Sequence, residues 1–337
     1  MRRRAHATLL SGAPDRALTQ PHVRLKPQVM ESWLRFKDWC GVLPQYLAPQ
    51  HRLSRLMHRL AGSERPWLVQ RLIRAFMARY PIDLRDAIES DPTRYRSLNA
   101  FFTRALRAHA RPLPADTQVL ISPVDGQLSQ FGVLAGGTLL QAKGHRYSVT
   151  QLLAIENTTA HPFRHGHFAT LYLAPHNYHR VHVPCDCTLE EVVYVPGRLF
   201  SGNTHTARVV PALFARNERV ILRCTGQGGE FAVVLVGAML VGSMALECVD
   251  LAPLYAQRLF KRIRFEHGIP IARGAEIGRF NMGSTVILVF ARETSEWNED
   301  ASPGMTVQVG HAIGRWRSAR STDLPGGYPA QDSPQSS

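Results

Sequence analysis

The longest uncharged run in the chain, from Phe231 to Leu246 (FAVVLVGAMLVGSMAL), sets the strongest limit on what the chain can fold into. A helix that crosses a bilayer needs about 20 consecutive apolar residues, and this run is shorter. The run is rich in valine, which favours strands, and Gly237 and Gly242 interrupt it. We therefore expect two buried strands joined at a glycine turn, and no membrane-spanning helix.

From about residue 118 onward, short runs of Val, Ile and Leu alternate with Gly, Pro and Asn turns. Runs of this length between turn residues are typical of buried strands. The clearest runs are Phe168–Leu173, Val192–Val195, Val220–Leu222, Phe231–Val236 and Val286–Phe290. The pattern predicts a β-rich domain over residues 111–318.

Residues 29–110 are expected to form a helical region, because apolar side chains recur there at helical spacing. Leu53, Leu56, Met57 and Leu60 form one such stripe, and no Asp or Glu occurs between residues 39 and 63. A basic helix with an apolar face suits a membrane interface, whereas an ordinary helix packed on the core is the alternative. Two further helices are expected over residues 67–80 and 98–108. The fold class is therefore α+β.

The chain carries 40 Lys and Arg against 26 Asp and Glu, a net charge of +14. Its hydrophobic content of 45% excludes a disordered chain. A strongly basic protein needs an acidic partner, and either nucleic acid or an anionic membrane surface would serve. Residues 1–28, with a basic start, and the Pro/Gly/Ser-rich residues 319–337 are expected to be disordered tails.

Five cysteines in 337 residues do not indicate a disulfide framework, because the count is odd and the spacing is sparse. Cys185 and Cys187 form a C-x-C pair, but a second pair at zinc-finger spacing is missing. We therefore expect no metal site and a reducing environment.

Three short motifs could carry chemistry, although each has an ordinary structural interpretation. Gly283 and Ser284 precede a predicted strand, and a glycine there leaves the adjacent carbonyl open to attack. His179 and His182 lie in an extended segment, where they would point to opposite faces unless the chain bends. Asp125 lies in a Pro-Val-Asp-Gly turn that needs no function.

Taken together, these motifs resemble the bacterial phosphatidylserine decarboxylase proenzymes, over about residues 43–315. Met282 stands where the common family motif has Leu, a swap that conserves volume. The stretches that carry the resemblance are 101–107 (FFTRALR), the Asp125 turn, 141–145 (QAKGH), 178–184 (YHRVHVP), 213–219 (LFARNER), 236–238 (VGA), 241–243 (VGS) and 274–285 (GAEIGRFNMGST).

The resemblance implies that the chain cuts itself between Gly283 and Ser284, with Asp125, His182 and Ser284 as the catalytic triad. Ser284 would become a pyruvoyl group that acts as the electron sink when the carboxylate of phosphatidylserine leaves. His179 would be the general acid that protonates the carbanion. The products would be phosphatidylethanolamine and carbon dioxide, with no metal and no soluble cofactor.

The same resemblance implies a barrel-like or sandwich-like catalytic domain, and two associated chains, 1–283 and 284–337, which form a homodimer. The partner would be phosphatidylserine in an anionic membrane rather than nucleic acid. The enzyme would be peripheral, on the cytoplasmic face of the cell membrane. Arg180 and Arg216 would bind the substrate phosphate.

Three other functions stay open from the sequence. The chain could be a pyruvoyl decarboxylase of a soluble amino acid, although the basic apolar helices argue against it. It could be an inactive relative that binds membranes or nucleic acid, although the complete set of Asp125, His182, Gly283 and Ser284 argues against that. An ordinary serine hydrolase would need a G-x-S-x-G elbow, which the stretch around Ser243 lacks.

Overall fold

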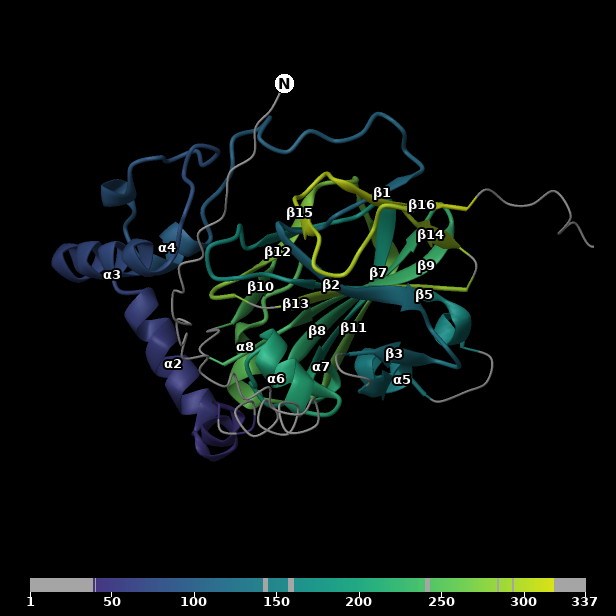
Figure 1. Ribbon diagram of the computed structural model, residues 1–337, viewed down its shortest axis with the longest axis horizontal. Coiled ribbons are helices and arrows are strands. Elements are labelled where there is room, and N and C mark those ends of the chain that lie inside the picture. The colour runs from purple at the N-terminus through teal and green to yellow at the C-terminus, as the bar shows by residue number, and fades with distance from the viewer. Residues whose placement is uncertain are drawn as a thin grey trace, which may run out of the picture.

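A computed structural model describes residues 39, 41–141, 145–156, 161–239, 243–283, 285–292 and 294–317 (Figure 1). The predicted tails 1–28 and 319–337 lie outside the described residues, and so does Ser284. The described part of the chain is a mixed α+β fold, as predicted. Its N-terminal helices lie at one side of a β-rich domain.

The centre of the β-rich domain is an antiparallel sheet of eight strands in the order β11-β7-β8-β9-β13-β5-β2-β15. All five strands predicted from the sequence belong to it. The bounds are β2 Gly126–Val133, β5 His167–Tyr172, β7 Cys187–Val195, β8 Arg219–Gly226, β9 Gly229–Val236, β11 Lys261–Ile271, β13 Thr285–Phe290 and β15 Thr306–Val307.

Both faces of this sheet are covered, which explains why its inner strands are apolar throughout rather than alternating. On β13, Val286 and Leu288 face one apolar cluster, whereas Ile287 and Val289 face another. Side chains of consecutive strand residues point to opposite faces, so a strand buried on both sides needs an apolar residue at every position. The result is a layered, sandwich-like core with β13 near its middle.

In the described part of this domain, three small antiparallel sheets, four short α-helices and the 3-10 turn Pro162–His165 surround the central sheet. Two small sheets add Val181, Met244 and Trp316 to the first cluster, while α5 and α7 add Leu152 and Leu213 to the second. The sheets are β1 Val119–Ile121, β16 Ala312–Trp316 and β14 Ser295–Trp297; β10 Met244–Leu246, β12 Glu276–Phe280 and β6 Arg180–His182; and β3 Thr138–Leu140 with β4 Arg146–Ser148. The helices are α5 Val149–Leu153, α6 Thr204–Val209, α7 Leu213–Arg216 and α8 Ala252–Gln257.

The uncharged run 231–246 contains two strands, as predicted, but the second is only partly buried, and Gly242, at the expected turn, lies outside the described residues. Its first half is β9 in the central sheet, and its end is β10 in a small sheet. Among the described residues, no helix has the length and apolar character needed to cross a membrane.

The helical region contains α2 Gln50–Ala61, α3 Pro66–Arg79 and α4 Leu98–Phe102, which pack around a third apolar cluster. The predicted fourth helix is shorter than expected, because it ends at Phe102 rather than Ala108. There Thr103 caps the helix with both its backbone N–H and its hydroxyl on the Asn99 carbonyl. The extended chain that follows carries Arg104 into the interior, where it is buried.

Helix α2 turns half of its predicted apolar stripe outward, because Met57 and Leu60 are half-buried while the other two residues are exposed. Its buried residues are Gln50, Ser54 and Ala61, whereas Leu53 and Leu56 are 37% and 64% exposed. This is the reverse of a helix packed on a core by its leucines, which was the alternative interpretation of the sequence. The arrangement leaves an exposed apolar stripe beside arginines.

Candidate active site

The predicted cleavage segment is the crossing between two sheets. The chain leaves β12 at Phe280, in a small sheet, and enters β13 at Thr285, in the central sheet. Gly283 has a φ of +31°, in the left-handed region that favours glycine. Glycine adopts this conformation without steric cost, so the chain can turn between the two strands at this position.

Gly283 packs directly against the candidate catalytic histidine His179. A Cβ atom added to Gly283 would lie 3.5 Å from His179 Nε2, 3.8 Å from the Leu173 carbonyl oxygen and 4.0 Å from Phe102 Cζ. These are ordinary contact distances, so Gly283 lies next to the imidazole, and it is the left-handed φ rather than lack of space that favours glycine here.

His179 is fully buried and neutral. Its Nδ1–H donates to the Asn177 carbonyl at 2.8 Å, and the Phe102 ring lies 3.9 Å from the imidazole, centroid to centroid. Burial lowers the pKa of His179 to about 3. Because Nδ1 carries the proton, Nε2 presents a lone pair, and it has no hydrogen-bond partner among the described residues. His179 can therefore accept a proton at the cleavage segment.

Arg104 supports the loop that orients His179. Its Nη2 donates to the carbonyls of His176 and Asn177, at 3.2 and 3.4 Å. Its Nε and Nη1 are buried without a hydrogen-bond partner among the described residues. Desolvation lowers the pKa of Arg104. A guanidinium in this position makes protonation of the nearby His179 costlier, and its charge lowers the pKa of that imidazole further.

His182 is also neutral, but both of its nitrogens are occupied. Nδ1 donates to the Gly274 carbonyl at 2.7 Å, and Nε2 accepts the Tyr178 hydroxyl at 3.0 Å. Burial lowers the pKa of His182, whereas the carboxylates of Glu276 and Asp125 act in the opposite direction. The Gly274 carbonyl thus fixes the tautomer that leaves Nε2 as the acceptor.

The predicted orienting acid, Asp125, is held by other groups. Arg111 donates to both carboxylate oxygens, at 3.1 and 2.6 Å, and the Val309 N–H donates at 2.9 Å. Among the described contacts, no hydrogen bond joins Asp125 to His182. The Asp125 carboxylate acts on His182 only electrostatically, by raising the pKa of the imidazole.

The two arginines predicted to bind phosphate differ in position. Arg180 forms a 2.8 Å ion pair with Glu276 and donates to the Thr103 carbonyl at 2.9 Å, so its charge is neutralised beside the site. Arg216 is exposed at the end of α7, with its guanidinium 5.3 Å from the centre of the Phe200 ring.

The helical region holds the cleavage segment in place. Met282 packs against the cluster formed by α2, α3 and α4, which includes Phe101. Asn281 donates to the Ser243 hydroxyl at 2.6 Å and accepts a 3.3 Å bond from the Asn99 side chain. Because α4 supplies Asn99 as well as Phe102, the predicted division at residue 110 does not separate the helical region from the site.

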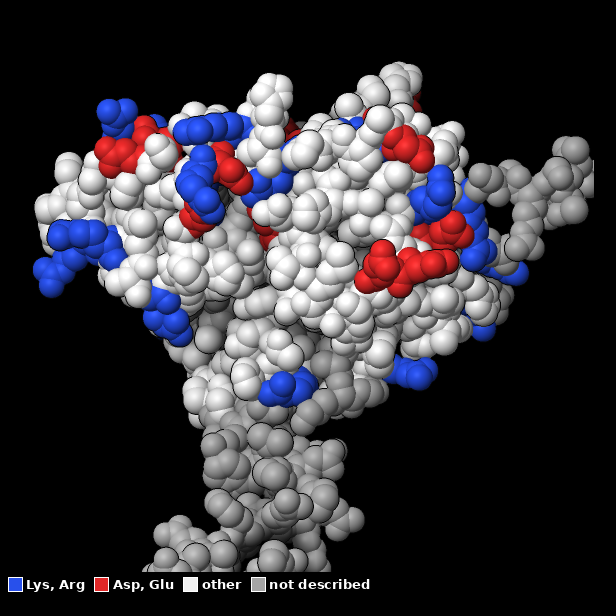
Figure 2. Space-filling view, turned by 45° about the horizontal axis from the view of Figure 1, so that its top comes forward, with Lys and Arg blue, Asp and Glu red and all other residues white. Residues whose placement is uncertain are grey.

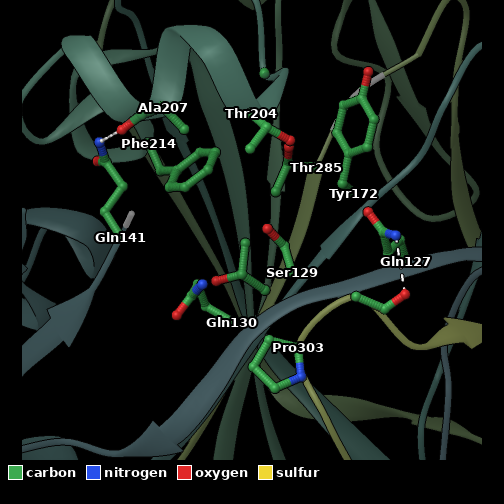
Figure 3. Close-up of a pocket in the computed structure, with 13 residues that line it drawn as sticks. Gln127, Ser129, Gln130, Gln141, Tyr172, Thr204, Ala207, Phe214, Thr285 and Pro303 are labelled. Atoms are coloured by element: carbon green, nitrogen blue, oxygen red, sulfur yellow. Dashed lines mark hydrogen bonds between the residues drawn. The ribbon is translucent and has the colours of Figure 1, made fainter. Parts of the chain in front are cut away.

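A polar cavity of about 250 Å³ lies beside the cleavage segment (Figure 3). Thr285 points into it from β13, and its Oγ1 is buried without a hydrogen-bond partner among the described residues. The remaining polar side chains of the lining come from β2, β5, the start of α6 and the residue after β3: Gln127, Ser129, Gln130, Gln141, Thr170, Tyr172 and Thr204. The cavity thus has unused hydrogen-bonding capacity one residue from the predicted cut.

Sequence reasoning did not identify Phe102, Arg104 or the cavity. The sequence held one indication of the cavity, namely the polar residues Thr170, within β5, and Thr285, at the start of the otherwise apolar β13. Across the described ranges, no three His, Cys, Asp or Glu residues are grouped to hold a metal ion. Four cysteines in the described ranges are free thiols: Cys185, Cys187, Cys224 and Cys248.

Comparison with known proteins adds independent findings. A sequence model of the family described as phosphatidylserine decarboxylase matches residues 98–315, and a second one, described as PSD, matches residues 40–81. The chain is similar to the phosphatidylserine decarboxylase proenzyme of Azoarcus sp. (strain BH72), at 46% identity over 82% of this chain and 96% of that protein. It is 47% identical to the proenzyme of Ectopseudomonas mendocina, over 81% of this chain and 96% of the relative. The proenzyme of Bordetella pertussis is 44% identical, over 82% and 95%.

Proposed function

The chain belongs to the phosphatidylserine decarboxylase family, and from this membership we propose how its residues carry out the reaction. It is a carboxy-lyase that converts phosphatidylserine to phosphatidylethanolamine and carbon dioxide. The relatives favour this function over a soluble amino acid decarboxylase or an inactive binding protein. The observation that carries the proposal is the contact between Gly283 and the unpaired Nε2 of His179.

The first step is self-cleavage between Gly283 and Ser284. The Ser284 hydroxyl attacks the Gly283 carbonyl, which converts the amide into an ester and leaves the nitrogen of residue 284 as an amine. Elimination then releases the Gly283 carboxylate, and hydrolysis by one water releases ammonia and leaves a pyruvoyl group at position 284. The lack of a side chain at Gly283 leaves its carbonyl open to the attack.

Asp125, His182 and Ser284 form the proposed triad for self-cleavage. The tautomer fixed by Gly274 makes His182 Nε2 a proton acceptor, and the Asp125 charge stabilises the imidazolium that forms. For this role, Nε2 exchanges the Tyr178 hydroxyl for that of Ser284. A base in this position raises the nucleophilicity of a serine that is otherwise unreactive.

His179 serves the decarboxylation. A pyruvoyl group at position 284 supplies the electron-withdrawing carbonyls that accept negative charge as carbon dioxide leaves. The buried donors and acceptors around Gly283 fit such a group, because His179 Nε2 has no other described partner there. His179 takes up a proton at Nε2 and delivers it to the carbon that has lost the carboxylate. Phe102 keeps water from the imidazole by stacking on it.

The polar cavity beside Thr285 receives the headgroup of the substrate. Its hydroxyl and amide groups can hydrogen-bond the serine carboxylate and the phosphodiester, and a headgroup fits a space of about 250 Å³. Arg216 is exposed and can reach a lipid phosphate, whereas Arg180 is already paired with Glu276. We therefore keep Arg216 as the stronger of the two phosphate ligands.

The mature enzyme consists of chains 1–283 and 284–337, which stay associated. β13 begins the small chain and pairs with β5 on one side and β9 on the other. Cleavage before β13 therefore leaves its inter-strand backbone hydrogen bonds to the large chain in place. The two chains form half of a homodimer that is peripheral to the cytoplasmic face of the cell membrane. The outward stripe of α2, with Leu53 and Leu56, and its arginines support binding to an anionic membrane rather than to nucleic acid.

The test is an intact mass spectrum of the purified protein under denaturing conditions. The uncut chain has a mass of 37.7 kDa, and cleavage should release a C-terminal fragment of about 6 kDa. Loss of ammonia places the fragment about 17 Da below the mass that simple hydrolysis before Ser284 would give. A fragment without this deficit would indicate proteolysis and would contradict the pyruvoyl proposal.

The same mass measurement, made on variants, distinguishes the roles of His179 and His182. His182→Ala and Asp125→Asn should leave the chain uncut, whereas His179→Ala should be cut and should decarboxylate poorly. An uncut His179→Ala chain would assign the Ser284 proton to His179 instead, as its position next to Gly283 also permits. Ser284→Ala is the uncut reference in each series.

A further inference from the structure

The turn between α8 and β11 exposes two large apolar side chains. Leu259 and Phe260 are 59% and 51% exposed, at the end of a helix whose C-cap residue, Arg258, has a φ of +52°. Adjacent large side chains that project together from a turn lose the hydrophobic stabilisation that burial would give. An exposed apolar pair of this kind indicates a surface that is covered by a membrane or by another molecule.

The turn is also basic. The stretch from Ala252 to Arg264 has four cationic residues and no Asp or Glu. Arg262 and Arg264 are engaged by the buried carboxylate of Glu191. The two others, Arg258 and Lys261, flank the apolar pair directly and are exposed. The composition repeats that of α2, although the two segments lie about 200 residues apart in the sequence.

The two acid-free segments meet in space. His51 of α2 hydrogen-bonds the Gly197 carbonyl through Nε2 at 3.1 Å, and Arg258 donates to the same carbonyl at 3.4 Å. Burial lowers the pKa of His51, and the charges of Arg258, Arg198 and Arg55 lower it further. Cationic side chains from three parts of the chain thus gather here. Figure 1 shows α2 and α8 together in the lower part of the molecule.

Exposed Glu247 and Asp250 line the hollow between His58 of α2 and α8, so the purely cationic part of this region is limited to the two segments themselves. The rest of the surface is mixed in charge as well. Figure 2 brings the upper side of Figure 1 forward, where red Asp and Glu side chains lie among the blue Lys and Arg. A second copy of this chain would bring a cationic patch against another cationic patch, which costs free energy. An anionic lipid surface instead offers negative phosphates to the arginines and an acyl boundary to the apolar side chains.

We propose that the turn 258–261 is a second membrane contact, in which Leu259 and Phe260 enter the acyl boundary while Arg258 and Lys261 bind lipid phosphates. This inference rests on the proposed peripheral binding through α2. A single amphipathic helix can roll about its axis on a membrane. A second contact on the catalytic domain fixes that rotation, and with it the orientation of the cleavage segment relative to the lipid.

The test is sedimentation of the mature enzyme with vesicles of phosphatidylcholine containing phosphatidylglycerol, an anionic lipid that is not the substrate. The L259S/F260S variant should partition at least about tenfold less than the wild type, because two buried apolar side chains are lost. K261Q should bind about fivefold less, and its deficit should vanish at high salt. The matched control is Val133→Ser, which changes an apolar residue that is 61% exposed on β2 and should leave binding unchanged.

The possible outcomes distinguish a failure of the membrane contact at turn 258–261 from a failure of membrane binding through α2. If L53S/L56S abolishes binding while L259S/F260S binds like the wild type, the second contact is refuted and binding through α2 stands. If the wild type does not bind vesicles, the peripheral membrane proposal itself fails. If L259S/F260S changes the oligomeric state in sedimentation velocity without changing vesicle binding, the turn is an interface between copies and the inference is overturned. Self-cleavage of each variant reports that it has folded.

Discussion

Arg104 and His179 hydrogen-bond to the same carbonyl oxygen, that of Asn177. The His179 Nδ1–H donates to it at 2.8 Å, and Arg104 Nη2 lies 3.4 Å away from it. A carbonyl oxygen has two lone pairs, so both bonds can form at once. The shared acceptor makes Arg104 a positioning residue, because it holds the carbonyl that fixes the tautomer of His179. Burial is the main cause of the lowered pKa of that imidazole, and the charge of Arg104 lowers it further.

Arg104→Met should therefore lower kcat for decarboxylation by about 100-fold, because a loosened loop displaces the imidazole. KM should change little, since Arg104 is not in the cavity. Arg104→Lys keeps the charge and should retain more activity. In an uncut Ser284→Ala background, NMR titration should show a higher pKa for His179 in Arg104→Met than in Arg104→Lys. Equal titration curves in the two variants would assign Arg104 a purely structural role.

The burial of His179 predicts acid sensitivity of the fold. The pKa of His179 is lowered to about 3 in the folded chain, so the unfolded chain binds more protons below the ordinary value of 6.5. Stability should therefore be complete above pH 6.5 and should fall as the pH drops toward 3. Between pH 7.5 and 5.5, His179 should cost the folded state about 1 kcal/mol.

Urea unfolding of the uncut Ser284→Ala protein at the two pH values measures this loss. His179→Gln in the same background removes the titrating group and should flatten the pH dependence by the same amount. His182 should contribute in the same direction, because burial lowers its pKa as well. An unchanged pH dependence in the glutamine variant would mean that His179 is accessible to protons in the folded chain.

The strands could be predicted from sequence because burial on both faces of the central sheet leaves a continuous apolar run. Val286–Phe290 is such a run, and it lies in β13 as expected. The extent of α4 could not be predicted, because its last turn is decided by hydrogen bonds from Thr103 to Asn99 rather than by apolar spacing. The apolar spacing of α2 indicated a helix correctly, but spacing does not say which side its leucines face.

The site was predictable only where a motif lies within one segment. The motif around Gly283 and the pair His179 and His182 could be read directly. The stacking of Phe102 on His179 joins residues that are far apart in the sequence, and it depends on how the helical region docks. The pairing of Asp125 with Arg111 likewise follows from tertiary packing, because a turn sequence does not reveal the partner of its carboxylate.

Thr285→Val tests the proposed headgroup cavity. The Oγ1 of Thr285 is buried and unpaired among the described residues, so replacing the hydroxyl with a methyl group should not lower stability. If the hydroxyl binds the headgroup, KM for phosphatidylserine should rise about tenfold, the cost of one lost hydrogen bond. Thr285→Ser keeps the hydroxyl and should have a KM near that of the wild type. A valine variant with unchanged KM would place the headgroup elsewhere.

Gly283→Ala tests whether the left-handed backbone at the cleavage segment matters. The added Cβ would lie 3.5 Å from His179 Nε2, on a backbone with a φ of +31° that alanine adopts at a cost. The contact with Nε2 is an ordinary one, so the unfavourable φ is the effect that should move the Gly283 carbonyl, and self-cleavage should slow by at least about tenfold. The rate is measured from the appearance of the small fragment after synthesis in a cell-free system.

Gly136→Ala is the matched control for this variant. Gly136 has a φ of +62°, so alanine is strained there too, but no atom lies within 4 Å of the added Cβ. Strain alone should cost a little stability in Gly136→Ala and should leave the cleavage rate unchanged. If both variants cleave at the same reduced rate, general destabilisation explains the defect. If only Gly283→Ala is slow, the rate depends on the left-handed backbone that glycine allows at the cleavage segment.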